Sequence, residues 1–173
     1  LDEIEKLNKQ ESIFHSLLDL NRVGMLGWSF GGAATIETCI ADSRFKAGIN
    51  IDGWPYGEQF NSDKGIAQAM MMIQSGAEDE QEDIIGELIF RKSESTACQL
   101  KIRGASHMNF WDFPLFFRIY RRLGYWDPID PLRLLEIESV FIKGFFDKYL
   151  KGENVDLHAL GSELFPEVSM KIN

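Results

Sequence analysis

Cysteine and histidine are scarce in this sequence. Its 173 residues include two cysteines, Cys39 and Cys98, and three histidines. Their spacing matches neither a metal site nor a disulfide framework, so we expect no metal ion, no other cofactor and two small buried thiols. No apolar run approaches the ~18 residues of a membrane-spanning helix, so we expect no integral membrane segment. The first twenty residues also carry too many charges for a signal peptide.

Basic residues are outnumbered as well. There are 18 Lys and Arg against 27 Asp and Glu, which gives a formal net charge of −9. Because nucleic acids and anionic membrane surfaces attract basic proteins, we expect neither of them as a partner. The remaining composition, 45% hydrophobic and 26% charged residues, is that of an ordinary globular domain.

Short apolar runs alternate with helical patterns along most of the chain. The predicted strands are 23–26, 45–51, 69–73 and 97–102, and the predicted helices are about 1–20, 31–42, 80–92, 109–123 and 130–152. Strands separated by helices favour parallel crossovers, so the sequence predicts an α/β fold with a mainly parallel sheet flanked by helices. Residues 1–152 would form one domain and 153–173 a tail or surface strap.

The most informative segment is Gly-Trp-Ser-Phe-Gly-Gly at 27–32, between a predicted strand and a predicted helix. It has the pattern G-x-S-x-G of a nucleophile elbow, a sharp turn that presents a serine hydroxyl. Side chains two residues before and two after the serine would collide across such a turn. We therefore predict that Ser29 is a nucleophile.

A serine hydroxyl needs a base that accepts its proton, and His107 is the best candidate. It follows the fourth predicted strand, so it would lie at the same sheet edge as Ser29. His15 falls in the first helical pattern and His158 in the patternless end, where surface roles are the simpler interpretation. The order serine, acid, histidine is that of an α/β-hydrolase.

Two carboxylates remain open as the acid. Asp52 ends the second predicted strand in apolar surroundings, and Asp79 follows the third strand in a highly charged stretch. Many α/β-hydrolases take the acid from the second strand after the nucleophile strand, which favours Asp79, whereas desolvation favours Asp52. The pattern alone does not decide between them.

Three blocks carry a family resemblance: GWSFGGA at 27–33, RFKAGINIDGW at 44–54 and RGASHMNFWDF at 103–113. In order and spacing the sequence resembles the platelet-activating factor acetylhydrolases of the plasma and intracellular type II family. The resemblance implies an α/β-hydrolase fold, Asp52 as the acid and the backbone N–H of Phe30 as an oxyanion-hole donor. It also implies a metal-independent serine esterase that cleaves short or oxidised acyl chains from phospholipids or related small esters.

Trp28 and Trp54 flank the predicted serine and acid, and we expect them to line the substrate-binding pocket. Two alternatives to the acetylhydrolase interpretation remain open. One is a cutinase-like polyester hydrolase or a dienelactone-hydrolase-like enzyme for small esters. The other is a catalytically silent α/β-hydrolase-like binding module.

Hydrolases of this fold carry several strands before the nucleophile strand, and here one predicted helix precedes it. We therefore expect the C-terminal part of a catalytic domain, with the N-terminal strands and the second oxyanion donor absent. The strand before Ser29 would then expose an apolar edge, which is a template for strand pairing. The expected partner of that edge is the missing N-terminal half or a second copy of the chain, and residues 1–173 alone would be nearly inactive.

Overall fold

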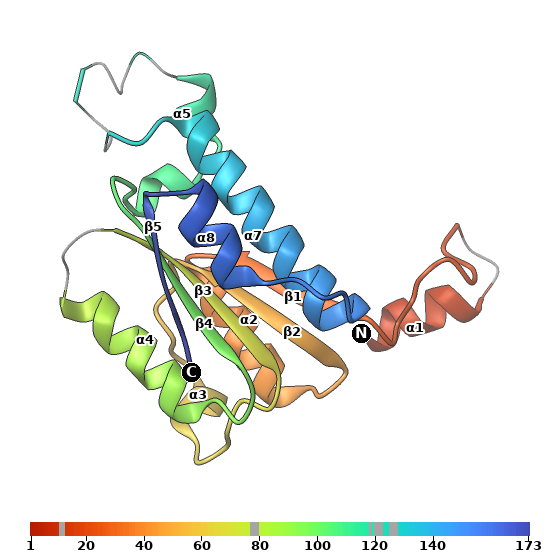
Figure 1. The fold of residues 1–173 in the computed structure, drawn as a ribbon. Helices are drawn as coiled ribbons and strands as arrows, with labels where there is room; N and C mark the ends of the chain where they lie inside the picture. Colours follow the sequence, from red (N-terminus) through yellow and green to blue (C-terminus); the bar gives the residue numbers. More distant parts are fainter. Residues whose placement is uncertain (11–12, 77–79, 118, 120–122, 125–127) are drawn as a thin grey trace.

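A computed structural model of the chain places five strands of its described residues in one sheet (Figure 1). The structure describes residues 1–173 except 11–12, 77–79, 118, 120–122 and 125–127. The strands are β1 (Val23–Trp28), β2 (Phe45–Ile51), β3 (Ala69–Ser75), β4 (Ala97–Ile102) and β5 (Val168–Ile172). They lie in the order β1-β2-β3-β4-β5, in which β1 to β4 are parallel and β5 runs antiparallel to β4. The predicted α/β fold and its four parallel strands are thereby confirmed.

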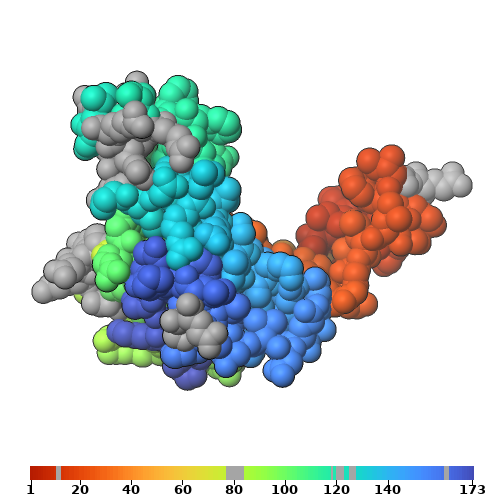
Figure 2. Space-filling view, turned by 45° about the horizontal axis from the view of Figure 1, so that its top comes forward, coloured from red at the N-terminus to blue at the C-terminus, as the bar shows by residue number. Residues whose placement is uncertain are grey.

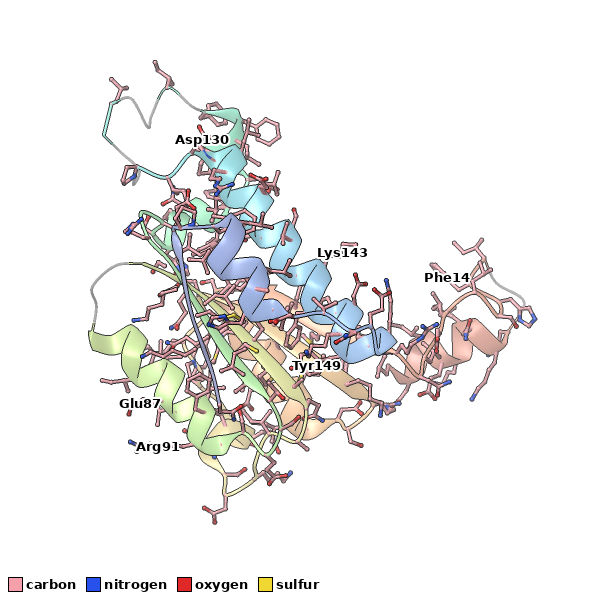
Figure 3. All side chains as sticks on the ribbon, viewed as in Figure 1. Phe14, Glu87, Arg91, Asp130, Lys143 and Tyr149 are labelled. Carbon is pink, nitrogen blue, oxygen red and sulfur yellow. The ribbon has the colours of Figure 1, made fainter. Side chains whose placement is uncertain are left out.

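The helices alternate with the strands as the sequence predicts. They are α1 (Asp2–Lys9), α2 (Phe30–Ala41), α3 (Glu58–Asn61), α4 (Glu80–Lys92), the 3-10 turn η1 (His107–Phe110), α5 (Phe113–Phe116), α7 (Pro131–Lys151) and α8 (Leu157–Leu164). Asp130, labelled in Figure 3, caps α7 by accepting the backbone N–H of Leu132 at 3.0 Å. Gly152 ends α7 in the left-handed conformation, with φ 74°. No helix in the described ranges has both the length and the apolar character to cross a membrane.

Two apolar cores cover the two faces of the sheet. Because successive side chains of a strand point to opposite faces, Met71 and Ile73 of β3 pack under α7 and α8, whereas Met70 and Met72 pack under α2 and α4. Figure 1 shows α7 and α8 over one face and α2 behind the other. Since β1 to β4 are parallel, the loops that follow their carboxyl ends meet at one edge of this layered core.

The first helix is shorter than predicted. The apolar spacing predicts a helix over about 1–20, but α1 ends at Lys9. Asn8 explains the break, because its side chain donates to the carbonyl of Leu18 at 3.0 Å and accepts the N–H of Leu18 at 3.1 Å, which folds the chain back. Figures 1 and 2 show α1 and the segment after it projecting from the rest of the molecule. Ile4 and Phe14 stay 43% and 41% exposed, so no packed face sustains a longer helix.

Residues 153–173 contain more regular structure than predicted. Instead of a patternless tail or strap, they form α8 and β5. The Asp156 carboxylate caps α8, and the side chains of Leu157 and Phe165 are 3% and 2% exposed within the core under α7. This segment therefore covers the β4 edge of the sheet.

The helix predicted over about 109–123 is broken. η1 ends at Phe110, α5 begins at Phe113, and parts of the predicted range lie outside the described residues. Asn109 Oδ1 accepts the backbone N–H of Ser106 at 2.8 Å, which closes the chain into a 3-10 turn. Pro114 lacks a backbone N–H, which disfavours the interior of a helix but is tolerated in the first turn, where α5 places it. The short helix α3, within the range 53–66 predicted as loop, is a smaller difference.

Candidate active site

Ser29 lies in the sharp turn between β1 and α2. Its backbone has φ 55° and ψ −119°, a conformation that costs a residue with a side chain about 1–3 kcal/mol. The sheet holds it there, because the N–H of Ser29 donates to the carbonyl of Ile51 in β2 at 2.8 Å. The local geometry is therefore that of the predicted elbow.

Two glycines allow this turn to be so tight. A Cβ on Gly27 would lie 2.2 Å from the carbonyl oxygen of Gly31, and a Cβ on Gly32 would lie 2.0 Å from Asn50 Oδ1. The sequence predicts the second restriction at Gly31, but a Cβ there would meet no atom within 4 Å. The restriction falls one residue later because Gly32 packs against the Asn50 side chain of β2.

His107 reaches Ser29 from the loop after β4. Gly104, with φ 81°, turns the chain, and Ala105 buries its side chain before the 3-10 turn begins at His107. His107 Nε2 lies 3.0 Å from Ser29 Oγ, and Nδ1 lies 2.7 Å from Asp52 Oδ2. Three side chains from three separate loops are thus joined in one hydrogen-bonded path.

Asp52 is the carboxylate that the structure brings to His107. It follows β2 with φ 51°, and its side chain is 9% exposed. Its second oxygen, Oδ1, accepts the backbone N–H of Ser75 at 2.9 Å, so both carboxylate oxygens have partners. Asp79, the alternative acid, lies outside the described residues.

This arrangement allows proton transfer from the Ser29 hydroxyl to the His107 imidazole. With the Nδ1 proton of His107 directed at Asp52, Nε2 is free to accept the proton of the Ser29 hydroxyl. A carboxylate that is shielded from water would stabilise the imidazolium that forms. The N–H of Phe30 belongs to the first turn of α2, where backbone N–H groups lack intrahelical acceptors and favour negative charge.

Asn50 is a site residue that sequence reasoning missed. Its side chain donates to the carbonyl of Gly53 at 2.7 Å and accepts the N–H of Gly53 at 2.9 Å, which closes the loop around Asp52. The available signal in the sequence was an amide between Ile49 and Ile51 in a predicted buried strand, where a polar side chain needs a hydrogen-bond partner. The structure leaves Asn50 2% exposed.

The two tryptophans predicted to line the pocket have different surroundings. The Trp28 ring stacks on the His107 imidazole with centroids 5.0 Å apart, and its Nε1 donates to the His107 carbonyl at 3.2 Å. Trp54 follows Asp52 by two residues and is 45% exposed. Trp28 therefore contacts His107 directly, whereas Trp54 is exposed to solvent two residues after Asp52.

Both cysteines are free and buried, as predicted. Burial raises the pKa of the Cys39 thiol to about 12 and that of the Cys98 thiol to about 11, so both stay protonated at neutral pH. Within the part of the chain that the structure describes, no three His, Cys, Asp or Glu side chains are grouped so that they could hold a metal ion.

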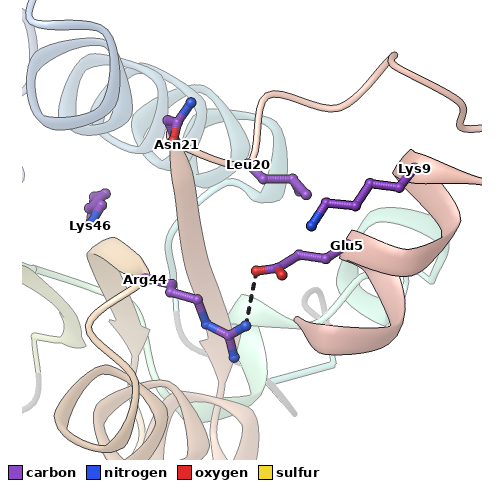
Figure 4. A pocket seen from close by; sticks show the side chains of 6 residues that line it. All are labelled: Glu5, Lys9, Leu20, Asn21, Arg44 and Lys46. Atoms are coloured by element: carbon purple, nitrogen blue, oxygen red, sulfur yellow. Dashed lines mark hydrogen bonds and ion pairs between the residues drawn. The ribbon is translucent and has the colours of Figure 1, made fainter.

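A cluster of ion pairs joins α1 to the turn before β2. The Arg44 guanidinium pairs with Asp42 and Asp2, each at 2.6 Å, and with Glu5 at 3.0 Å. It lowers the pKa of the Asp42 carboxyl to about 2. A cavity of about 350 Å³ lies beside it, lined by Glu5, Lys9, Leu20, Asn21, Arg44 and Lys46 (Figure 4). Because Arg44 precedes β2 and Ser29 follows β1, this cavity lies at the opposite end of the sheet from the candidate active site.

The chain matches a family described as "Platelet-activating factor acetylhydrolase, isoform II" over residues 6–162. It is 31% identical over 164 residues to a protein of Arthroderma benhamiae named "Probable 1-alkyl-2-acetylglycerophosphocholine esterase", a match that covers 85% of this chain and 42% of that protein. It is 35% identical over 98 residues to the platelet-activating factor acetylhydrolase of Cavia porcellus, which covers 56% of this chain and 22% of that one. The chain thus spans less than half the length of these curated relatives.

A solved structure, a ferulic acid esterase from Streptomyces cinnamoneus, is similar in fold. The two share a TM-score of 0.83 at 22% sequence identity, over 98% of this chain and 52% of that one. The likeness shows that this chain has an α/β-hydrolase type of fold.

Proposed function

Because the chain belongs to the platelet-activating factor acetylhydrolase, isoform II, family, we propose that it acts as a serine esterase with Ser29 as nucleophile, His107 as general base and Asp52 as the carboxylate that orients it. The observation that carries the proposal is the path from Ser29 Oγ through both ring nitrogens of His107 to Asp52, with distances of 3.0 and 2.7 Å. A base at this distance from a hydroxyl is what a serine nucleophile needs.

In the first half of the reaction, Ser29 Oγ attacks the carbonyl carbon of the ester while His107 Nε2 takes the hydroxyl proton. The carbonyl oxygen gains the negative charge, and the Phe30 N–H at the start of α2 donates to it. As the carbon–oxygen bond of the alcohol breaks, Nε2 returns the proton to the departing oxygen. The products of this half are a free alcohol and an acyl group on Ser29.

In the second half, water takes the place of the alcohol. His107 Nε2 accepts a proton from the water as its oxygen attacks the acyl carbon, and then gives that proton to Ser29 Oγ when the acyl bond breaks. Asp52 faces the Nδ1 proton throughout and stabilises the two imidazolium stages. The carboxylic acid leaves and the enzyme is restored, with no step that calls on a metal or cofactor.

The substrate class follows from the relatives rather than from the triad. The Arthroderma relative is named as an esterase of 1-alkyl-2-acetylglycerophosphocholine. We propose that this protein likewise removes short or oxidised acyl chains from phospholipids or related small esters. Family membership favours this substrate class over polyesters and dienelactones.

The proposal is tested with p-nitrophenyl acetate and with 1-alkyl-2-acetylglycerophosphocholine, using the protein expressed from its own gene. We expect hydrolysis of both esters, unchanged rates in EDTA, and a loss on the order of 10⁴-fold or more in kcat for Ser29→Ala. Ser43→Ala is the matched control, because Ser43 is exposed at the other end of the sheet, and it should stay within about twofold.

Ester hydrolysis that survives Ser29→Ala would remove this serine from the mechanism. A folded protein that hydrolyses neither ester would instead favour the catalytically silent binding module.

A further inference from the structure

His107 lies on a partly exposed loop, although its ring has to keep a fixed orientation. Its ring must stay in line with both Ser29 and Asp52, yet 43% of the side chain is exposed. The hydrogen bonds to Asp52 and Ser29 hold the two ring nitrogens, and they leave the ring free to rotate about the line that joins those nitrogens. A second support is therefore needed to fix the plane of the imidazole.

Trp28 supplies two contacts to His107 from a rigid strand. It is the last residue of β1, paired with Ile51 of β2, and its side chain packs against the core under α7. Its indole N–H donates to the backbone carbonyl of His107 at 3.2 Å, and its ring lies 5.0 Å from the imidazole at an interplanar angle of 29°. One contact fixes the main chain of His107, and the other fixes its ring.

Further aromatic rings continue from Trp28 into the segment that follows His107. Trp111 stacks on Trp28 with centroids 6.4 Å apart and an interplanar angle of 13°, and Phe113 stacks on Trp111 at 5.4 Å. These rings join the end of β1 to the start of α5. His107 is thus connected through Trp28 to stacked rings that follow it in the chain, at Trp111 and Phe113.

We propose that Trp28 is a positioning residue, which holds the His107 imidazole in line between Ser29 and Asp52 through its indole N–H and its ring. The inference rests on the proposed function, since it assigns Trp28 a role in the same reaction. It differs from the expectation that Trp28 lines the substrate pocket, because a positioning residue changes the rate of proton transfer and leaves substrate binding unchanged.

Two substitutions separate the two contacts. Trp28→Phe keeps an aromatic ring and removes the N–H donor, whereas Trp28→Leu removes both. Since a misplacement of about 1 Å can cost 10²-fold, we expect kcat for p-nitrophenyl acetate to fall about tenfold in Trp28→Phe and about 100-fold in Trp28→Leu, with KM within about twofold. The matched control is Phe116→Leu, an aromatic residue of α5 that is 78% exposed, and its kcat should stay within about twofold.

The decisive step repeats Trp28→Phe and Trp28→Leu in a His107→Ala background. If Trp28 acts through His107, neither change lowers the residual rate further. If the Trp28 changes lower the rate of His107→Ala by the same factors as they lower the wild-type rate, the inference is overturned. A rise in KM with kcat unchanged would also overturn it and would make Trp28 a substrate contact. Trp28→Phe keeps the test valid if Trp28→Leu fails to fold. A His107→Ala variant with an undiminished rate would instead contradict the proposed function.

Discussion

Among single residues, Asp52 is the one whose substitution distinguishes most sharply between the two candidate acids. Its Oδ2 faces His107 Nδ1 at 2.7 Å and its Oδ1 accepts the N–H of Ser75. In Asp52→Asn the amide would present a donor to Nδ1, which favours the tautomer with the proton on Nε2 and leaves no base for Ser29. We expect kcat to fall on the order of 10⁴-fold, measured with p-nitrophenyl acetate, while the protein stays folded.

The effect of Asp52→Asn on kcat is compared with the same substitution at Asp63 and at Asp79. Asp63→Asn, at an exposed position in the loop after α3, is the matched control and should stay within about twofold. Asp79→Asn should cost less than about tenfold if Asp79 is a surface charge. The opposite ranking, with Asp79 critical and Asp52 dispensable, would show that the acid belongs to the later strand.

The sequence predicts Ser29 from a motif and His107 from a strand-end position, and the structure brings the two side chains within hydrogen-bond distance. The sequence did not separate Asp52 from Asp79 without the family resemblance, since both follow strands and the pattern carries no side-chain directions. The role of Trp28 was also beyond it, because it depends on a contact with His107, which is far away in the chain. The role of Asn50 depends on the direction in which its side chain turns toward Gly53, and the sequence does not give side-chain directions.

Among the elements, the helix α7 packs on the sheet and also carries a carboxyl group, Glu138, that should make the free energy of unfolding depend on pH. Glu138 lies on this helix, and its side chain is partly buried. Burial, together with the negative charge of Asp112 before α5, raises the pKa of this carboxyl to about 7. Its proton is therefore held more tightly in the folded protein than in the unfolded chain.

The stability contribution of this carboxyl follows from the raised pKa. It is fully present below the unfolded pKa and is lost as the pH rises through about 7. Between pH 5.5 and 8, the free energy of unfolding of the wild type should fall by about 2 kcal/mol more than that of Glu138→Gln. Urea denaturation at the two pH values measures this, with Glu153→Gln, exposed just after α7, as control. If the free energy of unfolding falls equally in the wild type and in Glu138→Gln, the carboxyl of Glu138 does not contribute in this way.

Sequence patterns predict most of the strands and long helices, but not the end of α1 or the formation of β5. The strands β1 to β4 and the long helices follow from apolar periodicity and caps, since their burial is regular. α1 stops early because Asn8 bonds to Leu18 rather than continuing the helix, and β5 forms because β4 offers a free edge. Both outcomes depend on tertiary partners that a local pattern does not contain.

At the scale of the whole molecule, the described sheet has two edge strands, β1 and β5, and β5 carries Lys171 whereas β1 carries no charged residue. Among the described residues β1 pairs only with β2, its sequence holds no proline or charge, and Leu26 is 48% exposed. Such an edge is a template for strand pairing. We expect a polypeptide of residues 1–173 to self-associate through β1, which sedimentation at micromolar concentrations measures.

A charge on that edge should prevent the association. Leu26→Lys is expected to shift the polypeptide to monomer, whereas Leu132→Lys, at a position on α7 that is 56% exposed, should leave its association state unchanged. A wild-type polypeptide that sediments as a monomer would show that β1 is not used in this way.

The claim that Ser29 is a nucleophile activated by His107 is tested most directly by labelling with a fluorophosphonate, followed by mass spectrometry to locate the modified residue. We expect one phosphonylated site, on the peptide that contains Ser29, which is absent in Ser29→Ala and forms at least about 100-fold more slowly in a folded His107→Ala variant. Modification of a different serine, or equally fast labelling without His107, would contradict it.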